Sequence, residues 1–351
     1  MKRMYKGREY SDCLNDDNRT TNYRLPFVSI LIPVYQVERY IERCARSVFE
    51  QTYPKLEFIF VDDDSHDASI DILQKVKNEY PNRKDDVIVI HHKQNLGLAA
   101  SRNTAVNASH GEFVFHVDSD DWVDRDAVSA LIQKQLETGA DIVSAEADDY
   151  KEGLFSMHLT GGWDLEKKDL LIGLLTYKVS TTIWRRLIRK KLYVDYDVRC
   201  DENGSGGEDF QVLPRLIYYA EIVSGIEKCI YHHDLSNKNS ITNNAQDNID
   251  SQIQGLVSVR TVVQFFSNKE STLRSLVEGM EIRNIHYWMI NNVVSSNRSG
   301  YAVFLRYLRN TDPVIWHYVR WDNSFVRLVE SHYFSIKLLL FFRRLKSKIM
   351  R

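Results

Sequence analysis

The sequence predicts an α/β fold in which a mostly parallel central sheet carries helices on both faces. From residue 28 to about residue 149, strand-like runs alternate with segments of helical spacing, an order that is typical of parallel sheets. Several of these runs are apolar at consecutive positions, as in strands buried on both faces. Polar residues stand out where the predicted strands end, which is the edge where such sheets bind their ligands.

The first two strand–helix units have the clearest spacing. VSILIPV (28–34) is a continuous apolar run, and a helix is predicted over 37–51. LEFIFVD (56–62) is the next strand, and Ser65 or Asp67 is a candidate cap for a helix that runs to about residue 80. The predicted buried face of the first helix comprises Val37, Tyr40, Ile41, Cys44, Val48 and Phe49.

The alternation continues through three more strands. The predicted order is a strand over 86–92, a helix over 97–109, a strand over 112–118, a helix over 125–139 and a strand over 140–148. Residues 150–245 are more mixed and include a Gly-rich insert at 201–209, while residues 250–351 read as mostly helical.

Bulk composition narrows the class of protein. The chain has 351 residues, enough for about two domains, with 43% hydrophobic and 27% charged residues. A net charge of −2 argues against nucleic acid as a partner. The four cysteines show no metal-site or disulfide spacing, which favours a reducing compartment. They are Cys13, Cys44, Cys200 and Cys229.

The two ends of the chain differ from its middle. Residues 1–26 read as a polar arm without the apolar core of a signal peptide, and no run reaches the roughly 18 apolar residues of a spanning helix. Residues 333–351 hold six basic residues and no acidic one. On a helix this segment would be amphipathic, which favours a cytoplasmic protein lying against an anionic membrane surface; packing on protein stays open. Its apolar face would comprise Leu338, Phe341, Phe342, Leu345 and Ile349.

A cluster of carboxylates follows the strand over 112–118. Asp118, Asp120 and Asp121 lie within four positions, where they repel one another unless a cation is bound. A hard divalent metal that is shared with substrate phosphates fits such a cluster, and a solvated turn is the plainer alternative. The sequence has neither GxGxxG after its first strand nor GxxxxGK[ST] anywhere, so a dinucleotide-binding dehydrogenase or a P-loop NTPase is not expected.

An ordered set of motifs resembles inverting glycosyltransferase family 2 of the bacterial surface-polysaccharide type, whose fold is GT-A. PVYQVERY, QTY and VDDDS resemble the opening of that family, and QNLGLAASRN, DSDDW and GGEDF resemble its later motifs. TTIWRRLIRKKLY (181–193) and NSIT (239–242) resemble further segments of bacterial members. The match covers about residues 28–245 in the expected order.

The resemblance implies a role for each matched residue. Asp209 would be the catalytic base and Asp120 the direct metal ligand, with Asp118 between metal and ribose. Tyr35 would flank the base of the nucleotide and Asp63 would accept its hydrogen bond, as from uracil N3–H. The other nucleotide-sugar residues would be Pro33, Val34, Asn95, Arg102 (near the diphosphate) and Ser119, and the supporting residues Glu208, Asp121, Trp184 and His233.

The sequence departs from the family pattern at three positions. Gln36 replaces the usual Asn, and Leu96 replaces the first Gly of a pair and leaves only Gly97. Asp64 stands where Gly is common, a mild change because Asp tolerates a left-handed turn. None of the three changes removes a carboxylate that the mechanism needs.

The resemblance implies a hexosyl-type glycosyltransferase with Mn²⁺ or Mg²⁺. It would move a sugar from a nucleotide-sugar, a UDP-sugar above all, to a glycan or lipid-linked glycan in capsule, O-antigen or lipooligosaccharide synthesis. The implied organisation is an arm at 1–26, a GT-A domain at 27–245 with a nucleotide-sugar half (27–122) and an acceptor half (123–245), and a helical region at 246–351. Two alternatives stay open: a sugar nucleotidyltransferase and a non-catalytic glycan- or nucleotide-binding scaffold at the membrane.

Plainer interpretations exist for several of these residues. Asp62 and Asp63 can form turns or caps, and the pair Glu208–Asp209 can cap a helix without excluding catalysis. His232 and His233 fit a structural role better than a ligand role. The basic run over 185–191 is typical of a solvated helix face, and contact with an anionic acceptor or lipid is the sharper alternative.

Overall fold

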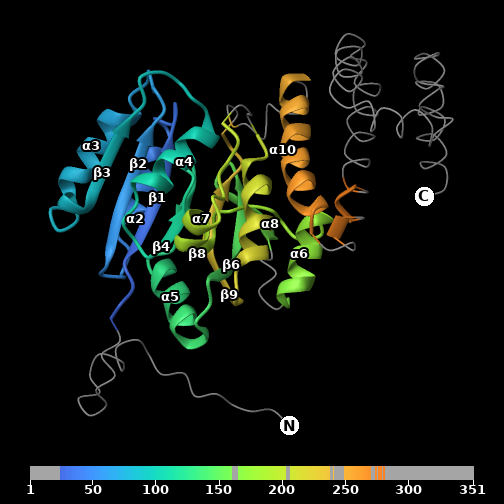
Figure 1. The fold of residues 1–351 in the computed structure, drawn as a ribbon. Helices are drawn as coiled ribbons and strands as arrows, with labels where there is room; N and C mark the ends of the chain where they lie inside the picture. Colours follow the sequence, from blue (N-terminus) through green and yellow to red (C-terminus); the bar gives the residue numbers. More distant parts are fainter. Residues whose placement is uncertain are drawn as a thin grey trace, which may run out of the picture.

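The computed structural model describes residues 24–159, 165–202, 206–237, 240 and 249–269, together with residues 273, 274, 276–278 and 280 (Figure 1). The first half of these residues alternates strands and helices as the sequence predicts. Its elements are β1 (Val28–Val34), α2 (Ile41–Phe49), β2 (Leu56–Asp62), α3 (Ser69–Glu79), η1 (Lys84–Asp86), β3 (Val87–His91), α4 (Leu98–Ala108), β4 (Phe113–His116), β5 (Trp122–Val123) and α5 (Ala127–Thr138).

The second half adds longer strands and further helices. These elements are β6 (Ile142–Lys151), β7 (Leu154–Leu159), α6 (Lys167–Leu175), β8 (Arg186–Arg189), α7 (Lys191–Asp195), α8 (Glu208–Tyr219), β9 (Val223–Asp234) and α10 (Ile249–Ser267). The polar arm at 1–23, most of NSIT and the basic C-terminal segment lie outside the described residues.

One sheet of nine strands runs through the described molecule in the order β3-β2-β1-β4-β8-β6-β9-β5, with β7 paired to β6. The four strands β3, β2, β1 and β4 are parallel, which confirms the parallel sheet that the sequence predicts for this half of the described residues. Strand β8 then runs antiparallel to both β4 and β6, while β6 and β9 are parallel. The carboxyl ends of β1, β2 and β4 therefore meet at one edge.

Helices cover both faces of the sheet (Figure 1). Residues Ile30 and Ile32 of β1 pack with α2, α3 and α5, whereas the intervening Leu31 packs with α4, α6, α8 and α10. Successive residues of a strand point to opposite faces, so β1 supplies apolar side chains to both cores. All seven of its residues are buried, and its one polar side chain, Ser29, donates a hydrogen bond to Glu57.

Two predicted elements differ from the observed ones. The first helix begins at Ile41 rather than at Val37, although Ile41, Cys44, Val48 and Phe49 form its buried face as predicted. The basic run is not a solvated helix face: Arg186 to Arg189 form strand β8, and Arg185 and Arg186 are 0% exposed. A run of charged residues does not by itself indicate solvent exposure, because the tertiary fold can bury arginines. Burial also removes Arg185 and Arg186 as contacts for an external anion.

Candidate active site

The edge of the sheet places the residues that follow β1 and β2 side by side. Pro33 and Val34 are buried at the end of β1, and Tyr35 directly after them is 45% exposed. Gln36 and Asp64 have positive φ angles of 52° and 63°, so the two turns after β1 and β2 both bend through left-handed residues. The turn at Asp64 confirms that Asp is tolerated where Gly is common.

Asp63 organises the approach to helix α4. Its Oδ1 accepts a hydrogen bond from Leu96 N and its Oδ2 one from Gly97 N, each at 2.8 Å. His92 Nδ1 lies 2.7 Å from Oδ1, and the exposed Asn95 donates from Nδ2 to the Asp63 carbonyl. Asp63 therefore holds the turn that leads into α4, and it is only 3% exposed.

The turn Asp118–Asp121 is fixed by strand β9. Tyr231 donates its hydroxyl proton to Asp121 Oδ2 (2.6 Å) and accepts a hydrogen bond from Asp118 N (3.0 Å). Asp121 Oδ1 accepts from Asp234 N. Burial first, and then the charges of Asp120 and Asp118, raise the pKa of the Asp121 carboxyl. Asp121 thus closes the turn internally, while Ser119 is buried within the turn.

Two further side chains hold Asp120. Arg43 Nη2 donates to the Asp120 carbonyl (2.7 Å) and pairs with Asp234 Oδ2 (2.6 Å), and its guanidinium lies over the Trp122 ring. Asn237 Nδ2 donates to Asp120 Oδ2 at 2.9 Å. Burial, and next the charge of Asp118, raise the pKa of the Asp120 carboxyl.

Arg102 on α4 lies among three carboxylates. Its Nη2 is 3.1 Å from Asp118 Oδ1 and 3.5 Å from Glu208 Oε1, and its Nη1 is 2.9 Å from Asp209 Oδ1. Burial alone would lower the pKa of Arg102, but the charges of Asp209, Asp118 and Glu208 outweigh burial and raise it.

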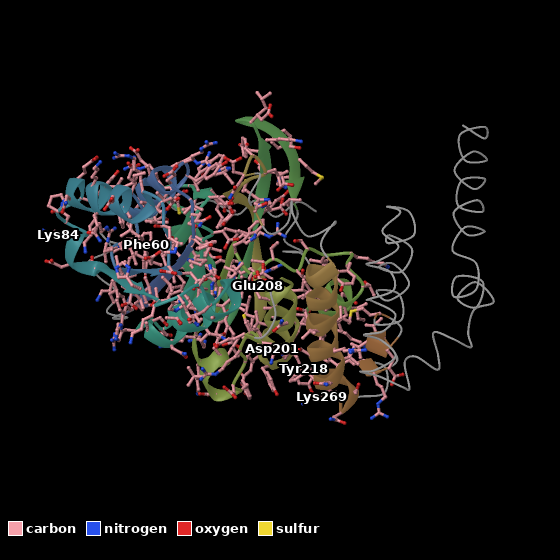
Figure 2. The ribbon with its side chains drawn as sticks, turned by 90° about the horizontal axis from the view of Figure 1, so that it is seen from above. Phe60, Lys84, Asp201, Glu208, Tyr218 and Lys269 are labelled. Carbon is pink, nitrogen blue, oxygen red and sulfur yellow. The ribbon has the colours of Figure 1, made fainter. Side chains whose placement is uncertain are left out.

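The cluster lies in the interior of the described molecule. Glu208 is near the centre of the view in Figure 2, with Lys84 and Lys269 on opposite sides of it.

Asp209 has the features of a general base. It lies in the first turn of α8, and its Oδ2 accepts from Ile183 N at 3.0 Å. Its Oδ1 faces Arg102 without hydrogen-bond geometry and has no hydrogen-bond partner among the described residues. Burial raises the pKa of Asp209 to about 7, since the opposing effect of Arg102 is offset in part by Glu208 and Asp118. A buried carboxyl that titrates near neutrality suits proton transfer.

Trp184 and His233 form the wall behind the turn. Trp184 is stacked on Tyr231 with ring centroids 4.4 Å apart, and His233 lies 5.2 Å from the same indole. His233 Nδ1 is 2.9 Å from Asp149 Oδ1. These contacts give both residues a packing role beside the carboxylates.

The carboxylates of Asp118 and Asp120 fit a hard divalent cation. One oxygen of each is bonded, to Arg102 and to Asn237 respectively, and the other oxygen makes no hydrogen bond to the part of the chain that is described. Two hard oxygen donors that repel each other suit Mn²⁺ or Mg²⁺. The sequence pattern and this donor set point to the same two residues.

Four supporting residues were not predicted from the sequence: Arg43, Tyr231, Asp234 and Asn237. Each is far along the chain from the Asp118–Asp121 turn that it contacts, with separations from 77 residues for Arg43–Asp120 to 117 for Asn237–Asp120. Only the acid-rich turn itself carried a local signal, because an isolated Tyr or Arg does not indicate what it will contact.

Comparison with known proteins shows which protein family part of this chain resembles. Residues 29–196 match the model of glycosyl transferase family 2. Glycosyltransferase GlyA of Streptococcus pneumoniae is 30% identical over 217 residues, which are 58% of this chain and 30% of GlyA. Putative glycosyltransferase EpsH of Bacillus subtilis is 31% identical over 214 residues, which are 59% of this chain and 60% of EpsH. The chain thus spans less than two thirds of either relative.

Solved structures share the fold at low sequence identity. S. aureus TarS in complex with UDP-GlcNAc has a TM-score of 0.56 and 17% identity over 84% of this chain and 91% of that one. A mannosyltransferase from Pyrobaculum calidifontis, in complex with GDP-Man and Mn²⁺, has a TM-score of 0.52 and 14% identity over 90% of this chain and 84% of that one. The fold is GT-A, as the sequence predicts.

A membrane-spanning helix is absent from the described part of the chain, where no helix combines sufficient length with sufficient apolar character.

Proposed function

Because residues 29–196 match the model of glycosyl transferase family 2, we propose that this protein is an inverting, metal-dependent glycosyltransferase. It moves a sugar from a UDP-sugar to a hydroxyl of an acceptor in bacterial surface-polysaccharide synthesis. The observation that carries the proposal is the placement of Asp209 beside the Arg102–Asp118 pair, with a pKa of about 7 and a buried Oδ1 that is ion-paired to Arg102 and accepts no hydrogen bond from the described residues.

Asp209 is the base in this proposal. The acceptor hydroxyl must lose its proton as it attacks the sugar, and Asp209 Oδ1 takes that proton. A positioned base of this kind contributes about 10²–10⁴-fold in rate. A single base opposite the leaving group gives one displacement, hence inversion of the anomeric centre.

The nucleotide is held by the opposite part of the site. Tyr35 is exposed directly after β1 and supplies an aromatic face for the base of the nucleotide. Asp63 can accept a hydrogen bond from the nucleotide base while it holds the turn before α4, because a carboxylate has about four lone-pair positions and three contacts are occupied. Asp118 and Asp120 hold Mn²⁺ or Mg²⁺, which neutralises charge that develops on the diphosphate leaving group.

Two parts of the proposal extend beyond the described residues. The acceptor is a glycan or a lipid-linked glycan, the class of acceptor that the ordered sequence motifs imply. Peripheral attachment to an anionic membrane surface would use the basic segment 333–351, whose composition favours such a surface. Recruitment to anionic vesicles, compared between the full chain and one that ends at residue 332, tests the second part.

The direct test of donor binding is a thermal-shift panel of nucleoside diphosphates with Mn²⁺. A ligand that binds only the folded state stabilises it by mass action, so UDP should raise the melting temperature more than GDP or ADP does. Asp120→Asn should remove most of this shift, since it removes a metal ligand. The matched control is Asp126→Asn at an exposed aspartate that pairs with Lys228, and it should keep the full shift.

An equal shift with EDTA in place of Mn²⁺ would contradict metal-dependent binding. Release of pyrophosphate from a nucleoside triphosphate and a sugar phosphate would instead identify a nucleotidyltransferase.

A further inference from the structure

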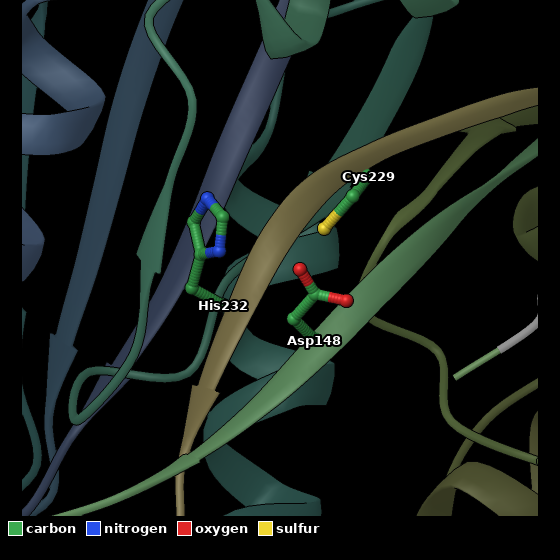
Figure 3. Close-up of side chains that lie close together, drawn as sticks. All are labelled: Asp148, Cys229 and His232. Carbon is green, nitrogen blue, oxygen red and sulfur yellow. The ribbon is translucent and has the colours of Figure 1, made fainter. Parts of the chain in front are cut away.

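Three side chains of types that commonly bind transition metals lie close together on one face of the paired strands β6 and β9. They are Asp148 of β6 and Cys229 and His232 of β9, and one potential ligand atom of each lies within 4.8 Å of the others (Figure 3). Their types, a carboxylate, a thiol and an imidazole, make a donor set that is common for Zn²⁺. None of the three belongs to the proposed sugar-transfer machinery.

An irregularity in the sheet brings the two β9 residues to one face. Cys229 and His232 are three positions apart, and in a regular strand they would point to opposite faces. The register between β6 and β9 shifts here: Glu146 pairs with Cys229, but Ala147 pairs with Tyr231, which leaves Ile230 as an extra residue. Such a bulge re-aims the side chains that follow it, so His232 joins Cys229 on the face of Asp148.

The hydrogen bonds of His232 leave one ring nitrogen available. Its Nε2 lies 2.9 Å from Asp124 Oδ1, an acceptor that places the ring proton on Nε2. Its Nδ1 is buried, has no hydrogen-bond partner among the described residues, and faces Asp148 and Cys229 (Figure 3). A buried nitrogen lone pair without a partner is costly unless something binds it. Imidazoles that bind metals characteristically donate their other N–H to a carboxylate in this way.

Asp148 is held in place by a partner of its own. His158 of β7 contacts it through Nδ1 at 2.7 Å from Asp148 Oδ1, and the other ring nitrogen of His158 contacts Glu146. The thiol of Cys229 lies 3.7 Å from the Tyr231 carbonyl. Asp148, through His158, and His232, through Asp124, therefore have the kind of supporting contact that orients ligands in metal sites.

We propose that Asp148, Cys229 and His232 form a second metal site that binds a borderline-soft divalent cation such as Zn²⁺. Thiolate and imidazole donors select Zn²⁺ over Mg²⁺ or Mn²⁺. Binding replaces the thiol proton of Cys229, which passes to solvent, and a water molecule completes a four-coordinate shell.

The site lies on the other side of β9 from the carboxylates of sugar transfer. Tyr231 and His233 contact Trp184, whereas His232 is stacked on Trp122 and contacts Tyr150. Trp122 directly follows the Asp118–Asp121 turn, so a metal on His232 would fasten β5 to β6 and β9 next to that turn. This role is structural and independent of the proposed sugar transfer.

Cobalt substitution tests the site with a readout that is separate from activity. The full chain, freed of metal with a chelator, is titrated with Co²⁺ while its absorption spectrum is recorded. We expect a thiolate-to-cobalt charge-transfer band that saturates at one equivalent of Co²⁺ per chain and is lost when one equivalent of Zn²⁺ is added. Absence of this band in the wild-type chain would overturn the proposal.

Variants locate the site and separate it from the nucleotide metal. Cys229→Ser should abolish the charge-transfer band, and His232→Gln and Asp148→Asn should weaken Zn²⁺ binding in chains whose circular dichroism is unchanged. Asp124→Ala, which removes the acceptor of the His232 Nε2–H, should weaken Zn²⁺ binding about 10–100-fold. The controls Asp120→Asn and His110→Gln should keep the band, since His110 is an exposed histidine beside Glu57. A band that persists in Cys229→Ser would overturn the assignment.

Discussion

Asp209 shows how its surroundings prepare a single side chain for chemistry. Burial raises its pKa from 3.8 to about 7, and Arg102 prevents a larger rise. The carboxylate therefore stays ionised above neutral pH and accepts a proton more readily than an exposed aspartate does. Asp209 lies in the first turn of α8, where the helix dipole favours a negative charge, and its Oδ2 accepts a hydrogen bond from Ile183 N rather than from an N–H of the helix.

The raised pKa of Asp209 predicts the pH dependence of activity. The base works only when ionised, so kcat/KM should rise with pH through about 7 and level off above it. Asp209→Asn should lower the rate about 10²–10⁴-fold and remove this limb, whereas Asp126→Asn should keep it. A pH–rate series on the three proteins checks this. An unchanged rising limb in Asp209→Asn would mean that another group is the base.

At this scale the sequence identified the carboxylates but not how each is used. The cluster at 118–121 indicated a cation, and the structure separates its members: Asp121 is consumed by Tyr231 and Asp234, while Asp118 and Asp120 each keep an oxygen available. That distinction depends on contacts with residues more than a hundred positions away. Arg102 was predicted near the diphosphate, and the structure places it among three carboxylates.

The elements around the site depend on a few backbone positions. Helix α4 begins at Leu98, after Gly97 with a φ of 89° and a ψ of 165°, a conformation that L side chains rarely adopt. Through Gly97 N and Leu96 N, this turn holds the carboxylate of Asp63. The single glycine that remains from the family's pair thus has a defined structural task.

Gly97→Ala should damage both stability and nucleotide binding. The substitution strains the backbone by about 1–3 kcal/mol and shifts the two N–H groups away from Asp63. Gly153→Ala is the matched control, because Gly153 also has positive φ (78°) but lies in the β6–β7 turn. Melting curves with and without UDP and Mn²⁺ should show a lower melting temperature for both variants and a reduced UDP shift only for Gly97→Ala. Equal UDP shifts would contradict the role given to this turn.

Elements with regular spacing were predicted well, and short ones were not. Strands β1 and β2 match their predicted bounds because a run of consecutive apolar residues has few alternatives. Strand β8 lies where a solvated helix face was expected, because its four residues, RLIR, begin and end with a charge. Burial of Arg185 and Arg186 is a consequence of the tertiary fold, and burial lowers the pKa of both.

Across the whole molecule, Arg102 joins two parts of the chain that are distant in sequence. It belongs to α4, packed against β1 and β2, and its partners Glu208 and Asp209 belong to α8, packed against α6 and α10. The parallel half of the sheet was predicted from the alternation of strands and helices. The antiparallel strands β5 and β8 were not, because their partner strands lie far along the chain. Strand β7 pairs locally with β6 in a hairpin, and most of its residues are exposed.

Arg102→Met should destabilise the protein by about 3–5 kcal/mol, since it leaves carboxylates buried without their cation. The loss should be larger at pH 8 than at pH 5, because Asp209 titrates near 7 and its protonation relieves the unpaired charge. Urea unfolding at the two pH values measures both effects. Arg125→Met, at an exposed arginine, should stay within about 0.5 kcal/mol of the wild type. A loss that does not change with pH would argue against the charge-based explanation.

The central claim is that metal-assisted sugar transfer proceeds with Asp209 as base. The most direct test measures UDP release from a UDP-sugar by the wild type and by Asp209→Asn, each with Mn²⁺ or EDTA, together with UDP binding. The account predicts turnover only for the wild type with Mn²⁺, and equal Mn²⁺-dependent UDP binding by both proteins. Undiminished turnover by Asp209→Asn, or by the wild type in EDTA, would contradict it.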